Sequence, residues 1–160
     1  MTPVSPRLLR EPVHFFALGF GSGLAPKAPG TAGTVVGVLL DPVLRLLGLE
    51  LRILVVALMF VAGVWLCGES ARRLGTHDHS AIVWDEIVGY LALMLVLPAG
   101  WPWALAGFVV FRFFDIVKPW PIRQLDHGVG GGLGIMLDDI MAAVWGAVVL
   151  LGSAALLGTT

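Results

Sequence analysis

The sequence has few charged residues for its length. Charged residues make up only 13% of the 160 residues, hydrophobic residues make up 58%, and the mean hydropathy is +0.91. Because a soluble domain carries roughly 25% charged residues, we expect a membrane-embedded protein with one domain over residues 1–160. The formal net charge is -1 and no basic block occurs, which argues against a nucleic-acid partner.

Cysteine is nearly absent as well. The single Cys67 excludes an internal disulfide, so no disulfide partner is expected, and it excludes a metal site built from several cysteines. Cys67 begins a C-x5-R string that ends at Arg73, which is the spacing of a thiolate phosphatase loop. The string continues an apolar segment and lacks the glycines that such a loop needs, so we interpret it as helix.

Several motifs of nucleotide and phosphate chemistry are also missing. The sequence contains neither G-x-x-x-x-G-K-[ST] nor G-x-G-x-x-G, so the common nucleotide-binding loops are excluded. A D-x-D pair, an S-R…H signature and the D-G-x-x-A-R motif of phosphatidyltransferases are absent too. The chain therefore offers no side chain that a familiar motif would identify as a covalent nucleophile.

The apolar segments that are present predict an all-α helical bundle. Val35–Leu49 and Ile53–Gly68 flank a short turn, which predicts a helical hairpin. Ile87–Phe111 carries no charge, and Pro98–Pro102 at its centre favours a turn over a kink, which predicts a second hairpin. Ile140–Gly158 is long enough to span a bilayer. We expect a single-domain, membrane-embedded bundle of about five to seven helices, with polar loops on one face.

Two segments are predicted to lack long regular structure. Met1–Leu18 carries three prolines, which disfavour a long helix. Gly128–Gly134 contains five glycines and is expected to be a flexible connector. The last acidic pair of the chain follows this connector, at the head of the final apolar helix.

Acidic residues mark the ends of the apolar segments. Asp85 and Glu86 precede the second hairpin, and Asp115 lies near its end. Arg112, Asp115 and Lys118 follow one another at steps of three, which places them on one side of a helix that Pro119 ends. If both hairpins form, these residues share one membrane face with Asp138 and Asp139 and with eight of the ten cations. The positive-inside rule makes that face cytoplasmic, and carboxylates from three segments suit a hard cation such as Mg²⁺.

Gly19–Thr34 has the composition of a loop, with exposed backbone N–H groups, hydroxyls and one cation. Such a loop, running into a helix near Thr31, suits a phosphate. A plain connector capped by Thr31 is equally compatible with the sequence. The candidate phosphate-binding residues on the whole chain are Ser22, Lys27, Thr31, Thr34, Arg112 and Lys118.

Four motifs of this sequence resemble the phosphatidylglycerophosphatase A family. They are GFGSGLAPKAPGTAGT, DHSAIVWDEIVG, FRFFDIVKPWPI and GGLGIMLDDIMAA. They occur in the family's order and cover most of the chain. The resemblance implies an all-helical, Mg²⁺-dependent phosphatase of the bacterial inner membrane. Its lipid substrate would be phosphatidylglycerophosphate, and its products phosphatidylglycerol and phosphate.

The resemblance also implies roles for individual residues. The expected catalytic residues are Asp85, Glu86, Asp115, Lys118, Asp138 and Asp139. The hypothetical Mg²⁺ ligands are Asp85, Glu86, Asp115 and Asp139, with Asp78 and Asp138 as further ligands or as supports for them. Water is the favoured attacking group. His79 is a candidate proton carrier, but a capping or solvent-facing histidine fits its position equally well.

One alternative comes from a different class, a small ion-binding membrane transport protein. Such a protein predicts acidic residues that face each other inside a span. In this sequence Asp41 alone lies within an apolar segment, and the other acids lie at segment ends.

Overall fold

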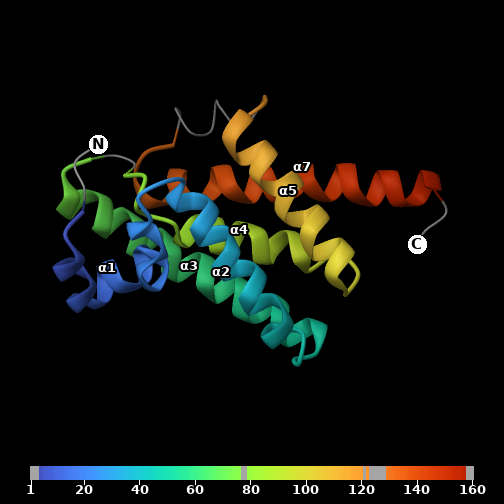
Figure 1. Cartoon of the computed structure of the whole chain (residues 1–160), viewed down its shortest axis with the longest axis horizontal. Coiled ribbons are helices and arrows are strands. Elements are labelled where there is room, and N and C mark those ends of the chain that lie inside the picture. Colours follow the sequence, from blue (N-terminus) through green and yellow to red (C-terminus); the bar gives the residue numbers. More distant parts are fainter. Residues whose placement is uncertain (1–3, 77–78, 121, 123–128, 158–160) are drawn as a thin grey trace.

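The computed structural model describes residues 4–76, 79–120, 122 and 129–157, and these residues form helices and connecting turns without any strand. The short N-terminal helices are η1 (Pro6–Arg10), α1 (Pro12–Ala17) and η2 (Gly19–Leu24). The longer helices are α2 (Pro29–Leu44), α3 (Leu49–Leu74), α4 (Trp84–Met94), α5 (Trp101–Val117) and α7 (Gly131–Leu157). Figure 1 shows α7 along the length of the molecule, and α7 packs against α3, α4 and α5.

Both predicted hairpins are confirmed. The chain turns between α2 and α3 at Gly48, the residue that precedes the first turn of α3. It turns again between α4 and α5, where Gly100 adopts a φ of 123° immediately before α5 begins. The signal for the first hairpin was the short turn that begins at Gly48, and the signal for the second was the proline and glycine cluster Pro98–Pro102. The structure places a turn at each of these sites.

The exterior of the bundle is apolar. Two helices, α3 and α7 up to Leu156, are long and apolar enough to cross a membrane by length and composition. Large apolar side chains also point outward, for example Leu39, Leu58 and Trp65. Many exposed apolar side chains together with two helices of this length fit a bundle embedded in lipid.

Helix α4 is the central element of the bundle. Its apolar residues are buried around the whole circumference, including Ile87, Val88, Leu91 and Met94. A helix that is hydrophobic all round belongs in a core. Only its first turn is acidic, so the folding of α4 places two carboxylates in the interior at one end of the bundle.

The prediction of a flexible glycine connector was wrong for Gly131–Gly134, which form the first turn of α7. A Cβ atom on Gly132 would lie 1.9 Å from the Val64 carbonyl oxygen of α3. The glycine therefore allows α7 to pack backbone to backbone on α3. As a consequence Asp138 and Asp139 lie about two turns inside α7, not at its head.

The N-terminal part of the chain confirms one prediction and corrects another. Over its described residues Met1–Leu18 forms the short helices η1 and α1 and no long helix, as its prolines predict. Helix α2 begins at Pro29, and the residue that precedes it is Ala28 in the left-handed region (φ 48°), so Thr31 does not cap the helix. Proline at the first helical position needs no N–H partner, which explains the earlier start.

A buried ion cluster closes the end of the bundle opposite the acidic turn of α4. Asp41 is 4% exposed, and its carboxylate lies 2.6 Å from Arg45 Nε and 3.6 Å from Arg52 Nη2. Both guanidinium groups also donate to the Met94 carbonyl at the end of α4, at 3.1 and 3.0 Å. The cluster therefore ties α2 and α3 to the turn between α4 and α5.

We expect Asp41→Ala to lower the free energy of unfolding by about 3 kcal/mol, because it leaves the buried Arg52 and the half-buried Arg45 without their carboxylate. Thermal denaturation in detergent measures the change. The matched control is Glu50→Ala, which removes an exposed carboxylate at the start of α3 and should change stability by less than about 0.5 kcal/mol. Equal stability of the two variants would contradict the structural role of Asp41.

Candidate active site

A cavity of about 270 Å³ lies at the acidic end of the bundle. It forms where the first turns of α2 and α4 meet the last turns of α5 and the second and third turns of α7. Its lining residues are Ala28, Pro29, Gly30, Ser80, Ile82, Asp85, Glu86, Arg112, Asp115, Ile116, Lys118, Asp138 and Asp139. Carboxylates from three separate helices therefore face one small space.

Three of these carboxylates form a tight group, which we call the acidic cluster: Asp85, Glu86 and Asp139. One oxygen atom from each lies within 4.8 Å of the other two. Glu86 Oε2 and Asp139 Oδ1 are buried, and no described residue donates a hydrogen bond to them. Burial, followed by the negative charge of Asp139, raises the pKa of Glu86 well above its usual range.

This arrangement fits a hard divalent cation. Carboxylates that are buried together repel one another unless a proton or a cation compensates their charge. Oxygen ligands without nitrogen or sulfur suit Mg²⁺, Ca²⁺ or Mn²⁺. The buried oxygens that accept no hydrogen bond are free to act as ligands.

Two cations, Arg112 and Lys118, also line the cavity. Arg112 pairs with Asp115 on the same helix, and its Nη1 atom lies 3.7 Å from Glu86 Oε1. Lys118 Nζ lies 2.5 Å from Asp138 Oδ2 of α7. Asp115 and Asp138 are thus each paired with a cation, and neither is one of the three carboxylates of the acidic cluster.

The end of α5 gives Lys118 an unusual backbone. Helix α5 ends at Val117, as Pro119 predicts, and Lys118 adopts the left-handed region with φ 44° and ψ 61°. This region costs a non-glycine residue roughly 1–2 kcal/mol. Strained residues of this kind gather at functional sites, and here the conformation accompanies the reach of the lysine amine to α7.

The first turn of α2 also faces the cavity, through Pro29 and Gly30. A Cβ atom on Gly30 would lie 2.1 Å from Glu86 Oε1 and 3.0 Å from Arg112 Nη1. Only glycine lets α2 approach this pair. The N-terminus of a helix presents free N–H groups and a partial positive charge, which favour an anion.

The structure does not bring the other predicted phosphate ligands to the cavity. Ser22 Oγ donates to the Gly19 carbonyl at 2.8 Å, and Thr34 is buried with its hydroxyl bonded to the Gly30 carbonyl at 2.9 Å. Lys27 is exposed and Thr31 is half-buried, and neither lines the cavity.

The glycine-rich loop has a packing role. A Cβ atom on Gly23 would lie 1.9 Å from the Ala81 carbonyl oxygen, and the Val83 N–H donates to the Ala17 carbonyl at 2.9 Å. The loop and the end of α1 therefore support the segment that leads into α4 and thereby position Asp85 and Glu86.

His79 and Asp78 are the two remaining residues for which the sequence predicts a role. His79 Nδ1 accepts a hydrogen bond from the Ala81 N–H at 3.2 Å, which is the capping alternative. Asp78 lies outside the described residues. Sequence reasoning missed Gly30 and Ser80 as lining residues. For Gly30 the available signal was its place directly after the proline that begins α2.

The fold and the site together indicate the class of protein to which this chain belongs. A buried carboxylate cluster, two cations and a helix N-terminus at one end of an apolar helical bundle are the parts of a phosphoryl-transfer site of a membrane protein.

Comparisons with known proteins specify the family. The family model of phosphatidylglycerophosphatase A matches residues 15–154. The phosphatidylglycerophosphatase A of Haemophilus influenzae is 45% identical over 153 residues, which cover 92% of each chain. That of Escherichia coli is 46% identical over 143 residues, covering 89% of this chain and 83% of the relative. No solved structure matches the chain.

A third relative, from Bacteroides thetaiotaomicron, is 36% identical over 140 residues and covers 82% of this chain. It is provisionally named as a phosphatidylinositol-3-phosphatase. The chain belongs to the phosphatidylglycerophosphatase A family, and it is a phosphatase.

Proposed function

We propose that this protein hydrolyses phosphatidylglycerophosphate to phosphatidylglycerol and phosphate with the help of Mg²⁺. The observation that supports the proposal best is the acidic cluster, with one oxygen of each of three carboxylates within 4.8 Å of the others. The names of the relatives from Haemophilus influenzae and Escherichia coli supply the substrate. Asp85, Glu86 and Asp139 would hold the metal.

A bound Mg²⁺ would polarise the phosphoryl oxygens and lower the pKa of a coordinated water. The chain's own groups supply the remaining contacts. Arg112 and Lys118 face the cavity and bind the phosphate oxygens, while the N–H groups at the start of α2 add partial positive charge. Asp115 holds the Arg112 guanidinium, and Asp138 holds the Lys118 amine. Both cations are therefore positioned before the substrate arrives.

The reaction breaks the bond between phosphorus and the terminal glycerol oxygen. The water oxygen bonds to phosphorus, and a proton passes to the glycerol oxygen. Ile82 and Ile116 supply apolar walls to the cavity, which strengthens the interaction between the cations and the charge that develops on the phosphoryl group.

Phosphate release from phosphatidylglycerophosphate in detergent micelles tests the proposal. We expect release with Mg²⁺, no release with EDTA, and weaker turnover of phosphatidic acid and phosphatidylinositol 3-phosphate. Acid quenching with ³²P-labelled substrate should leave no label on the protein, because water is the attacking group. Folded protein that releases no phosphate with any divalent metal would overturn the proposed reaction.

We further propose the bacterial inner membrane as the location, with the active face in the cytoplasm. Seven of the ten cations belong to described segments at the acidic end of the bundle, and the positive-inside rule directs such an end to the cytoplasm. Arg45 and Arg52 lie at the other end.

Lys27→Cys tests this orientation, since Lys27 is exposed and the native Cys67 is buried. A membrane-impermeant maleimide should label the variant in inverted vesicles and leave it unlabelled in intact spheroplasts. The wild-type chain is the control for background labelling of Cys67. Labelling in spheroplasts alone would reverse the orientation.

A further inference from the structure

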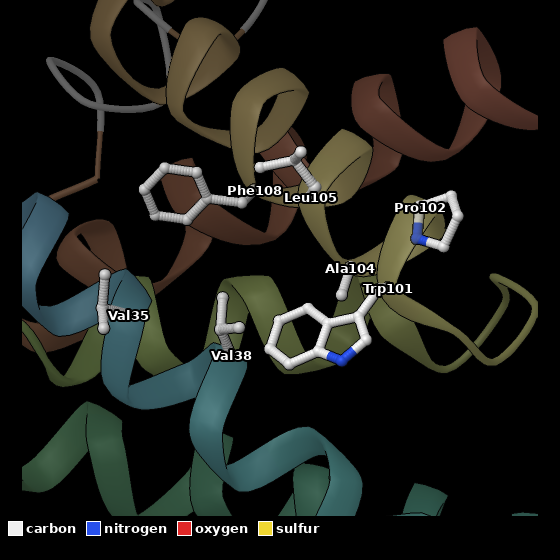
Figure 2. Close-up of a pocket in the computed structure, with 7 residues that line it drawn as sticks. All are labelled: Val35, Val38, Trp101, Pro102, Ala104, Leu105 and Phe108. Atoms are coloured by element: carbon white, nitrogen blue, oxygen red, sulfur yellow. The ribbon is translucent and has the colours of Figure 1, made fainter.

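An apolar groove lies between α2 and α5. It has a volume of about 620 Å³. Val35 and Val38 form one side, and Trp101, Ala104, Leu105 and Phe108 lie opposite (Figure 2). Figure 2 shows the Trp101 and Phe108 rings reaching from α5 toward α2. Trp101 is 75% and Leu105 64% exposed, so the protein itself leaves this groove open.

The groove leads to the candidate active site along one face of α5. Trp101, Leu105, Phe108, Arg112 and Asp115 follow one another at steps of four, three, four and three residues. This spacing places all five on a single side of a helix. The first three line the groove, and the last two line the acidic cavity. The apolar side chains of the groove and the proposed phosphate-binding residue Arg112 therefore lie in one row along α5.

The length of this row matches one leaflet of a bilayer. From Trp101 to Arg112 the helix rises about 16 Å, and half of the hydrocarbon core is about 15 Å thick. At its far end the groove adjoins a second cavity of about 350 Å³, which shares Val38, Trp101 and Ala104 and is lined by Asp41 and Arg45. The ion pair of Asp41 and Arg45 closes the apolar path there.

We propose that this groove binds one acyl chain of the lipid substrate while the phosphate of the same molecule lies between Arg112 and Lys118. The inference rests on the proposed function and adds to it the part of the protein that recognises the lipid tail. A lipid whose phosphate occupies the cavity has its chains directed into its own leaflet, and the groove is the apolar surface that begins beside Arg112. The site thereby selects phosphomonoesters that carry a long chain over soluble ones.

Filling the groove tests the inference. Val38→Trp places an indole inside it, while Leu39→Trp places the same side chain on the neighbouring position, which is 65% exposed and does not line the groove. The measured quantity is kcat/KM for phosphatidylglycerophosphate with long chains divided by that for a six-carbon analogue. We expect Val38→Trp to lower this ratio about tenfold, since losing the burial of about two methylene groups already has that effect. Leu39→Trp should keep the wild-type ratio.

Because Val38 is half-buried, Val35→Trp serves as a second variant at a more exposed groove position. Equal ratios in the groove variants and in Leu39→Trp would overturn the inference. Wild-type protein that hydrolyses neither substrate would instead contradict the proposed function.

A binding measurement that needs no turnover distinguishes failure of the groove inference from failure of the proposed function. The probe is a phosphatidic acid with a diazirine on one acyl chain, cross-linked to the wild-type protein in EDTA and mapped by mass spectrometry. We expect labels on α2 and α5 within the groove, and we expect unlabelled phosphatidic acid to compete while phosphatidylcholine does not. Labels spread evenly over the lipid-facing sides of α3 and α7 would overturn the groove assignment.

Discussion

Asp139→Asn is expected to lower the rate of phosphate release by about 10³-fold. Asp139 is 2% exposed and contributes one of the three oxygens of the acidic cluster. The amide keeps the shape of the side chain and removes the charge that a divalent cation needs. Steady-state release from phosphatidylglycerophosphate at saturating Mg²⁺ measures the effect.

The same variant should fold, and its stability gives a readout that is independent of turnover. In EDTA its melting temperature should equal or exceed that of the wild type, because the substitution removes one of three mutually repelling carboxylates. Mg²⁺ at about 100 times its dissociation constant should stabilise the wild type by about 2.7 kcal/mol and the variant far less.

Glu50→Gln is the matched control, because Glu50 is an exposed carboxylate distant in sequence from the cluster. It should keep both the wild-type rate and the response to Mg²⁺. Near-normal turnover of Asp139→Asn, or a wild-type melting temperature that does not change when Mg²⁺ is added, would show that the cluster does not hold the metal.

The sequence predicted the parts of the fold that depend on local signals. Pro98–Pro102 interrupts an apolar run. Proline disfavours the interior of a helix whatever surrounds it, because it lacks the backbone N–H and its ring clashes with the preceding turn. Once the second hairpin was predicted, Asp85 and Asp115 had to lie at the same end of the bundle. The structure places both in one cavity.

The parts that the sequence did not predict depend on contacts between distant segments. Gly132 belongs to a stretch with the composition of a connector, yet it lies in α7. Because it has no side chain, the backbone of α7 can lie against the Val64 carbonyl of α3. This contact sets the register of α7, which decides how deep Asp139 lies. No local pattern reports a contact between residues that far apart in the sequence.

The loop prediction is ambiguous for a related reason. Glycine and small hydroxyl residues suit a phosphate, but they also suit close packing and local hydrogen bonds. Ser22 and Thr34 bond to carbonyls three and four residues away. Gly30 does reach the cavity, where its added Cβ atom would meet Glu86 and Arg112. Its one local signal is its place directly after the proline that begins α2.

Gly30→Ala is therefore expected to lower kcat/KM by about 10²-fold while the protein stays folded. The added Cβ atom would lie 2.1 Å from Glu86 Oε1, so one of the two groups must move by roughly 1 Å or more to reach an ordinary contact distance. The Glu86 carboxylate ends a flexible side chain and moves more easily than α2. A displacement of about 1 Å at a reacting centre costs about 10²-fold in rate.

The loss should come with a higher Mg²⁺ concentration at half-maximal rate, since the displaced group belongs to the acidic cluster. Gly48→Ala is the matched control, because no atom lies within 4 Å of its added Cβ and its φ of -62° suits alanine. Titration of phosphate release with Mg²⁺ in both variants and the wild type makes the comparison. If Gly30→Ala titrates like Gly48→Ala, Glu86 is not a metal ligand, and the close approach of α2 serves packing alone.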